Sequence, residues 1–215
     1  PLHYLSRSGF SAAIVAQAAL NGAYMGSFIL TPLLLQNVLD FSETKTGLVS
    51  IARPLSFSLA GPFAGAVALR LGARRAAAGG AVAVVAALCW MSTLGLGSSV
   101  PVIMGALALA GVGMGLAMPP LSGSVTVSVD EADLGIAGAA QQMMIQVGIV
   151  FGITVMQAVQ QGRLPSVGLE SSYHWGYGAG AVLAVVAVVT ATRIASVSDR
   201  RARSSPGSEP VAASA

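Results

Sequence analysis

Long uninterrupted stretches of hydrophobic residues dominate this chain, and its charged residues are confined to short segments between them. The longest stretch runs from residue 76 to residue 129 and contains no Asp, Glu, Lys, Arg or His over 54 positions. About 20 helical residues cross the roughly 30 Å hydrocarbon core of a bilayer, so this stretch can hold two passes and a turn. The turn is predicted where helix-disfavouring residues cluster, at Gly95, Gly97, Ser98, Ser99 and Pro101.

Four further charge-free stretches raise the predicted number of spans to six. They cover residues 8 to 39, 54 to 69, 134 to 162 and 175 to 192. Because backbone groups have no water to bond in lipid, each span has to be helical. We predict helices at residues 12 to 36, 46 to 69, 76 to 94, 100 to 123, 134 to 158 and 176 to 195.

The predicted fold class is therefore an all-α integral membrane protein in which six transmembrane helices form one bundle. The bundle covers residues 11 to 195, after a lead-in at residues 1 to 10. Residues 196 to 215 are rich in Ser, Ala, Pro and Arg without apolar periodicity, which indicates a disordered tail. Because the chain begins at Pro1 with no initiator Met, we expect it to be a fragment of a longer protein.

Composition agrees with lipid as the solvent of this chain. Charged residues make up 9% of the sequence, hydrophobic residues make up 54%, and the mean hydropathy is +0.76. A soluble domain is about one quarter charged. The net charge of +3 comes from bases in short loops, which indicates membrane topology and argues against nucleic acid as a partner.

Alternate loops lie on alternate sides of the membrane, so the positive-inside rule can be applied directly. One side holds eight bases, namely Arg7, Arg70, Arg74, Arg75, Arg193, Arg200, Arg201 and Arg203. The other side holds only Lys45 and Arg163. Both termini are therefore predicted to be cytoplasmic.

A polar stripe marks one face of the first predicted span. Gln17, Asn21, Tyr24, Phe28 and Thr31 recur at spacings of four, three, four and three, which places them on one side of a helix. An amide buried without a partner costs about 1 to 3 kcal/mol, so amides at bilayer depth face protein or a water-filled cavity. We predict that this face lines an aqueous substrate cleft. The alternative is that its amides only bond neighbouring helices.

The fifth predicted span carries a second pair of amides. Gln142 and Gln146 are one helical turn apart, and we assign them to the same cleft with the same alternative. The third span and the core of the sixth, residues 179 to 189, carry no comparable groups. We therefore expect the first, second, fourth and fifth helices around the cleft and the other two outside it.

Arg53 is the only ionised side chain drawn into the interior of a predicted span, since Arg193 stands two residues before the end of the last one. It follows Thr46 by seven residues, about 10 Å along a helix, so it can snorkel to water at the outer mouth of the cleft. The alternative is an anion or gating contact near that mouth. Pro54 and Pro62 in the same span would let the helix bend.

Several kinds of site are absent from the predicted spans. No Asp or Glu lies inside a span, so the chain has no embedded carboxylate to carry a proton. His3 and His174 both lie outside the lipid, and no cluster of His, Cys, Asp or Glu has the spacing of metal ligands. We predict no catalytic residue, no metal and no cofactor, and we expect that the protein is not an enzyme.

Glycine pairs four residues apart recur in five of the six predicted spans. Such pairs let helices approach closely in lipid. They are Gly22 with Gly26, Gly61 with Gly65, Gly111 with Gly115, Gly148 with Gly152, and Gly176 with Gly180.

Several of these motifs together resemble one protein family. The loop between the second and third spans reads GAVALRLGARR over residues 65 to 75, which resembles the glycine and arginine loop motif of the major facilitator superfamily. The stretch LLLQNVLDFSETKTG over residues 33 to 47, with the glycines and prolines of residues 111 to 120 and IQVG at 145 to 148, resembles bacterial multidrug efflux members of its drug:proton antiporter group. The resemblance covers about residues 4 to 195.

The resemblance implies that this chain is the carboxyl-terminal half of an inner-membrane permease. Such a half contains two inverted three-helix repeats, and a second, amino-terminal half-bundle is its partner. The implied activity is proton-coupled export of amphiphilic drugs or metabolites by alternating access. An uptake facilitator of the same superfamily and a six-helix membrane scaffold that transports nothing remain as alternatives.

The resemblance also implies a cytoplasmic gate in the loop between the second and third spans. Its residues here are Gly65, Arg70, Gly72, Arg74 and Arg75. The family's preferred motif has an acid where this chain has Leu69, so a charge relay through this loop is not implied. The two glycines would permit a tight loop and close helix approach.

Overall fold

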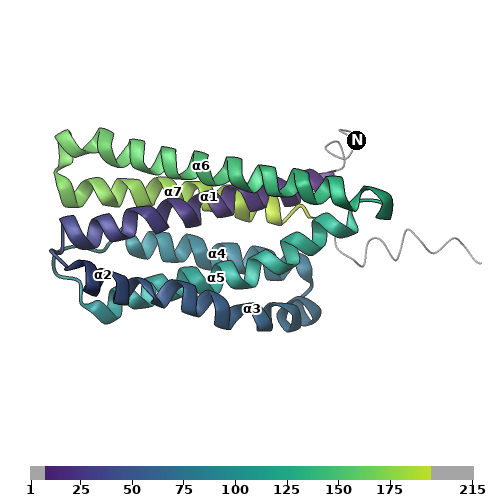
Figure 1. The fold of residues 1–215 in the computed structure, drawn as a ribbon, viewed down its shortest axis with the longest axis horizontal. Helices are drawn as coiled ribbons and strands as arrows, with labels where there is room; N and C mark the ends of the chain where they lie inside the picture. Colours follow the sequence, from purple (N-terminus) through teal and green to yellow (C-terminus); the bar gives the residue numbers. More distant parts are fainter. Residues whose placement is uncertain (1–7, 195–215) are drawn as a thin grey trace, which may run out of the picture.

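The computed structural model describes residues 8 to 194, and all regular structure in that part of the chain is helical (Figure 1). The helices are α1 Ser8–Asn37, α2 Glu43–Ser50, α3 Ala52–Leu71, α4 Ala73–Met91, α5 Val100–Val127, α6 Leu134–Val167 and α7 Leu169–Ala191, with a 3-10 turn at Glu131–Asp133. Six segments of the described chain are long and apolar enough to cross a membrane when α2 and α3 are taken together. The predicted all-α fold with six spans is confirmed.

Part of the predicted organisation lies outside the described residues. This applies to residues 1 to 7 of the lead-in, to the tail at 196 to 215, and to the bases Arg7, Arg200, Arg201 and Arg203. The cytoplasmic position of both termini therefore stays a prediction.

Several helices continue beyond the apolar stretches that revealed them. α6 runs to Val167 and α7 begins at Leu169, where we predicted a loop between residues 158 and 176. Gly168, with a φ of +81°, is the only residue between them. The amide of Gln160 on α6 donates to the Ser172 hydroxyl on α7 at 2.9 Å. The apolar stretches predicted only the part of each helix that lies in lipid. Beyond it, polar contacts such as this one accompany the continued helices.

The second span is broken at Ile51, between α2 and α3. Pro54 has no N–H, so the carbonyl of Ser50 cannot receive its helical hydrogen bond there. α2 begins at a cap in which the Ser42 hydroxyl accepts from the Lys45 N–H at 3.3 Å. The break leaves Arg53 in the first turn of α3.

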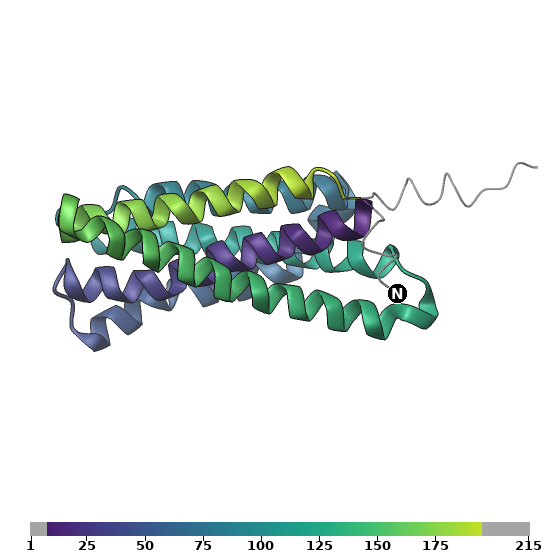
Figure 2. The same ribbon diagram turned by 90° about the horizontal axis from the view of Figure 1, so that it is seen from above.

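α1 and α5 lie in the middle of the bundle. α1 contacts α6 and α7, α5 contacts α3 and α4, and α1 also contacts α5. α4 and α7 contact each other on one side, and α6 lies on the opposite side (Figures 1 and 2). The first three spans correspond in order to the last three, so α1 corresponds to α5, α3 to α6 and α4 to α7. Under this correspondence the contact of α1 with α6 matches that of α5 with α3. The contact of α1 with α7 matches that of α5 with α4. This pairing is the one that two inverted three-helix repeats produce.

Four of the five predicted glycine pairs lie at helix contacts. A Cβ at Gly22 would meet the Gly148 carbonyl, and one at Gly111 would meet the Arg53 carbonyl. These glycines therefore set the spacing of α1 against α6 and of α5 against α3. A Cβ at Gly61 or Gly65 would meet nothing within 4 Å in the described chain, so neither of these two glycines is required for a close helix approach there.

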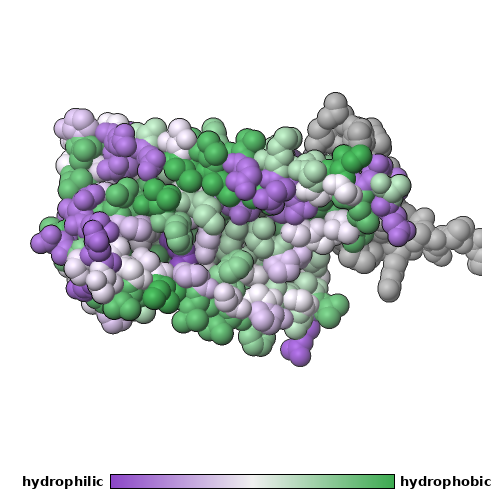
Figure 3. Space-filling view, viewed as in Figure 1, coloured by the Kyte–Doolittle hydropathy of each residue, from purple (hydrophilic) through white to green (hydrophobic). Residues whose placement is uncertain are grey.

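Large apolar side chains cover much of the outer surface (Figure 3). The second and fifth spans are the least enclosed, with 11% and 22% of their most apolar windows buried, against 67% for the first span. In Figure 3, hydrophilic side chains interrupt the apolar surface along α6 and gather at the ends of the bundle. This surface suits lipid and an apolar partner, because exposed apolar patches of this extent mark interaction surfaces.

Candidate functional site

Most of the predicted polar stripe of α1 lies inside the bundle. Gln17, Asn21, Tyr24 and Thr31 are all buried, and only Phe28, at 43% exposure, reaches the surface. In the described bundle these four side chains are enclosed because α5, α6 and α7 pack around α1. The role of these residues in substrate binding stays a prediction.

Gln17 joins three helices through its side-chain oxygen. Its Oε1 accepts from Nε2 of Gln141 on α6 at 2.8 Å and from Oγ of Ser122 on α5 at 3.5 Å. Gln141 also donates to the Ser122 hydroxyl at 3.2 Å. We call Gln17, Ser122 and Gln141 the amide cluster. Gln141 and Ser122 are half-buried, so the cluster reaches the surface between α5 and α6.

The amide cluster retains an unused donor. Nε2 of Gln17 has no hydrogen-bond partner although it is buried. Beside it, Nδ2 of Asn21 donates to the Gln17 carbonyl at 2.9 Å and contacts Sδ of Met118 at 3.5 Å. A free N–H next to a polar opening is the kind of group that orients a ligand.

Gln142 and Gln146 are exposed on α6. Neither makes a hydrogen bond to the residues that the structure describes. Their exposure agrees with the predicted open cleft wall, which stays a prediction. Gln141 was not predicted from the sequence, because neighbouring residues of a helix point about 100° apart and the adjacent glutamines Gln141 and Gln142 do not show which of them faces inward.

Arg53 does not snorkel to water, so that expectation is wrong. Its side chain is 1% exposed and reaches across to α1 instead of outward. Nη1 donates to the Tyr24 carbonyl at 3.5 Å, and Nη2 contacts Oγ1 of Thr31 and Sδ of Met91 at 3.5 Å each. Cζ lies 5.2 Å from the ring centroid of Tyr24 and 5.7 Å from that of Phe28. These groups on α1 and α4 enclose the guanidinium and take the place of water.

Tyr177 on α7 belongs to the same group of polar contacts around Thr31 as Arg53. It was not predicted from the sequence. Its hydroxyl donates to Oγ1 of Thr31 at 3.1 Å, and the residue is fully buried. Thr31 in turn donates to the Ser27 carbonyl at 2.7 Å. The spacing of Tyr173 and Tyr177, one turn apart at the start of the last apolar stretch, is the signal that could have found it.

The predicted gate loop forms the junction of α3 and α4. Gly72 alone separates the two helices and has a φ of +86°, so this tight turn depends on glycine. Arg70, Arg74 and Arg75 are exposed around it. A Cβ at Gly65 would meet nothing within 4 Å in the described chain, so no close helix approach there depends on this glycine. The gating role of these five residues stays a prediction.

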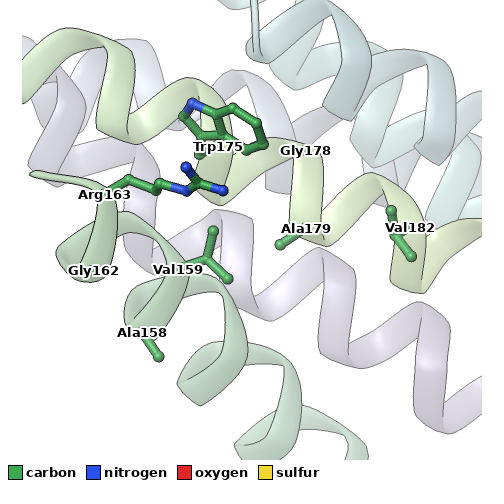
Figure 4. Close-up of a pocket in the computed structure, with 8 residues that line it drawn as sticks. All are labelled: Ala158, Val159, Gly162, Arg163, Trp175, Gly178, Ala179 and Val182. Carbon is green, nitrogen blue, oxygen red and sulfur yellow. The ribbon is translucent and has the colours of Figure 1, made fainter. Parts of the chain in front are cut away.

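A separate pocket of about 710 Å³ lies between α6 and α7 (Figure 4). Its lining is Ala158, Val159, Gly162, Arg163, Trp175, Gly178, Ala179 and Val182. Arg163 lies over the indole of Trp175, with Cζ 4.2 Å from the ring centroid. None of the predicted cleft residues lines this pocket. In residues 8 to 194 no group of three or more His, Cys, Asp or Glu gathers to hold a metal ion.

Comparison with known proteins gives one family and several structures of similar fold. Residues 13–214 match the Major Facilitator Superfamily. A structure of tetrameric PepTSo2 is similar with a TM-score of 0.79 at 19% identity, covering 86% of this chain and 39% of that chain. A bacterial homologue of the human drug peptide transporters PepT1 and PepT2 has a TM-score of 0.77 at 19% identity, covering 86% and 40%.

The xylose transporter XylE from E. coli, in an inward open conformation, is also similar. Its TM-score is 0.70 at 16% identity, and the match covers 90% of this chain and 48% of that chain. No curated protein matches the chain. At such low identity these structures show a shared fold alone. The chain spans less than half the length of each of them.

Proposed function

The chain belongs to the Major Facilitator Superfamily, and on that premise we propose that it is the carboxyl-terminal half of a bacterial multidrug efflux permease of the drug:proton antiporter group. The proposed activity is export of amphiphilic drugs or metabolites across the inner membrane by alternating access, coupled to proton exchange. The observation that carries this proposal is the family match along almost the whole bundle, combined with solved relatives more than twice as long as the matched region. The proposed partner is an amino-terminal half-bundle.

The proposed contact surface for that partner is the side on which α3 and α6 flank α1 and α5. α3 and α6 belong to the two least enclosed spans, and apolar side chains such as Phe63 and Phe151 are more than half exposed there. A second bundle on this side would leave the amide cluster, Gln142 and Gln146 near the midline between the two halves. Transporters of this type bind substrate at such a midline.

The cleft wall in this proposal combines few polar groups with apolar area, as small-molecule sites commonly do. The amide cluster and the two exposed glutamines supply hydrogen bonds. Phe28 and Met143, both exposed, supply apolar contact, and the thioether adapts to different shapes. This composition supports an amphiphilic substrate.

Proton coupling in this proposal depends on groups outside the spans of this chain. The acidic residues in the described part are Asp40, Glu43, Asp130, Glu131, Asp133 and Glu170, which lie at helix ends and in connections. The coupling carboxylates are therefore assigned to the other half-bundle or to the loops. Membership of a transporter family supports a protein without enzymatic activity.

The test is a flux assay on the complete natural protein in proteoliposomes, with ethidium as the amphiphilic cation. In vesicles that are acidic inside, proton exchange predicts accumulation of ethidium in the lumen, and a protonophore should abolish it. A facilitator would equilibrate ethidium regardless of the gradient. A scaffold would give no flux above that of protein-free vesicles, and either result would reject proton-coupled export.

Substitutions separate the cleft wall from the rest of the surface. Replacing Gln142 and Gln146 together by Leu should lower ethidium flux without changing the amount of folded protein. The matched control replaces Val182 and Val185 on α7 by Leu. Both valines are also exposed but lie on the side assigned to lipid. Equal losses of flux in both double variants would reject the assigned cleft wall.

A further inference from the structure

Arg53 carries a full positive charge into the bundle without a counter-ion. Its recorded hydrogen bonds go to a carbonyl, a hydroxyl and a thioether, and no acid of residues 8 to 194 lies within ion-pair distance of it. An arginine side chain stays protonated under all ordinary conditions. Because buried charges are normally paired, an unpaired one in a membrane span indicates a functional site.

The groups around Arg53 use little of its hydrogen-bonding capacity. Hydrogen bonds from a guanidinium to an anion are about 2.7 to 2.9 Å long, whereas its three recorded contacts are each 3.5 Å. Nε has no partner. The five donors of a guanidinium form a planar fork that matches a carboxylate, and here Nε is unused while Nη1 and Nη2 make only long contacts.

Phe28 is the side chain through which the surface reaches this cation. The guanidinium lies beside the rings of Tyr24 and Phe28, and of these only Phe28 is exposed. Phe28 also belongs to α1, on the side that we assign to the cleft.

We propose that Arg53 is the cation of a carboxylate-binding site that opens beside Phe28. Two flat aromatic faces next to a planar cation suit a carboxylate on a flat or apolar body. The carboxylate comes from a small organic acid in the cleft or from an acidic side chain of the other half-bundle. The second source rests on the proposed function, because it requires a second half.

The first experiment measures the melting temperature of the complete protein in detergent with sodium benzoate as the probe. A ligand that binds only the folded state raises that temperature. Benzamide, which has the same shape without charge, and sodium chloride at equal ionic strength are the controls. Arg53→Met removes the charge and keeps an apolar body, Arg53→Lys keeps the charge without the fork, and Arg70→Met removes an exposed arginine.

A small organic acid as the source predicts that benzoate, and neither control compound, raises the melting temperature. Arg53→Met should abolish that shift, Arg53→Lys should weaken the apparent affinity for benzoate about tenfold, and Arg70→Met should leave both unchanged. In buffer without benzoate, Arg53→Met should melt at or above the temperature of the unmodified protein, because it removes an unpaired buried charge.

An acidic side chain as the source predicts no benzoate shift and a lower melting temperature for Arg53→Met. In that case one acid-to-amide substitution in the other half should cost stability alone but add nothing to Arg53→Met. Two results together overturn the proposal. The first is that benzoate does not change the melting temperature. The second is that Arg53→Met is as stable as the unmodified protein, or that no acid-to-amide substitution in the other half couples to Arg53→Met. Ethidium flux on the same preparations tests the transport proposal separately, because neither melting result depends on flux.

Discussion

Nε2 of Gln141 on α6 donates a 2.8 Å hydrogen bond to Oε1 of Gln17 on α1. The two residues are far apart in sequence, and the bond crosses between the first three spans and the last three. It lies on the same helix pair as the close contact of Gly22 with Gly148. Glycine contacts thus bring the two backbones together, and the amides determine which faces meet.

The bond between Gln17 and Gln141 should contribute measurably to stability. Gln141→Leu leaves the buried Gln17 oxygen with only the 3.5 Å contact to Ser122, so we expect a loss of stability. In a double-mutant cycle with Gln17→Leu, the coupling should be about 0.6 kcal/mol, the average for such bonds between membrane helices. Unfolding in mixed detergent, followed by circular dichroism, measures it. Gln142→Leu is the control, and an equal loss there would contradict the assignment.

Gly152→Ala should destabilise the bundle by about 1 to 3 kcal/mol, the usual cost of overpacking. Its Cβ would meet the backbone of Gly22, which cannot move aside as a side chain could. Gly61→Ala in α3 is the matched control, because nothing lies within 4 Å of its Cβ. Melting temperatures of both variants in one detergent test this, and a similar loss for Gly61→Ala would refute it.

Gly72→Ala should cost about 1 to 3 kcal/mol through backbone strain. The residue has φ +86° and ψ 146°, a region that is essentially restricted to glycine. Gly79→Ala within α4 should instead be neutral or stabilising, since alanine favours helix by about 1 kcal/mol over glycine. The denaturation midpoint should therefore fall for Gly72→Ala and stay the same or rise for Gly79→Ala.

Cysteine labelling of the complete protein should separate water from lipid at exposed positions. With Cys89 replaced by Ser, Gln146→Cys should react with a membrane-impermeant maleimide, and Val185→Cys should not, although both positions are exposed. Asn21→Cys should react slowly because Asn21 is buried. Equal labelling of Gln146→Cys and Val185→Cys would remove the aqueous cleft from the interpretation.

The outcome for Arg53 shows why its surroundings were not predictable. The position of Arg53 along its helix gives its depth in the membrane, and at that depth an arginine side chain could reach water. The side chain instead follows the direction set by the rotation of α3, which turns it toward Tyr24 and Thr31 on α1. On its other side the Arg53 backbone contacts α5 at Gly111, where a side chain would not fit. Both α1 and α5 are distant from Arg53 in sequence, so neither contact could be expected from a local pattern.

By itself, the sequence determined the solvent, the number of membrane-spanning segments and their helical structure, because apolar length and the placement of charges act locally along the chain. It also identified four glycine pairs at helix contacts, and the family resemblance pointed to the glycine at the turn between α3 and α4. Only the tertiary structure decided that Gln141 and not Gln142 meets Gln17, that Tyr177 bonds Thr31, and that a side chain at Gly61 would meet nothing within 4 Å in the described chain. Each of these depends on how helices distant in sequence are rotated against one another, which no local pattern specifies.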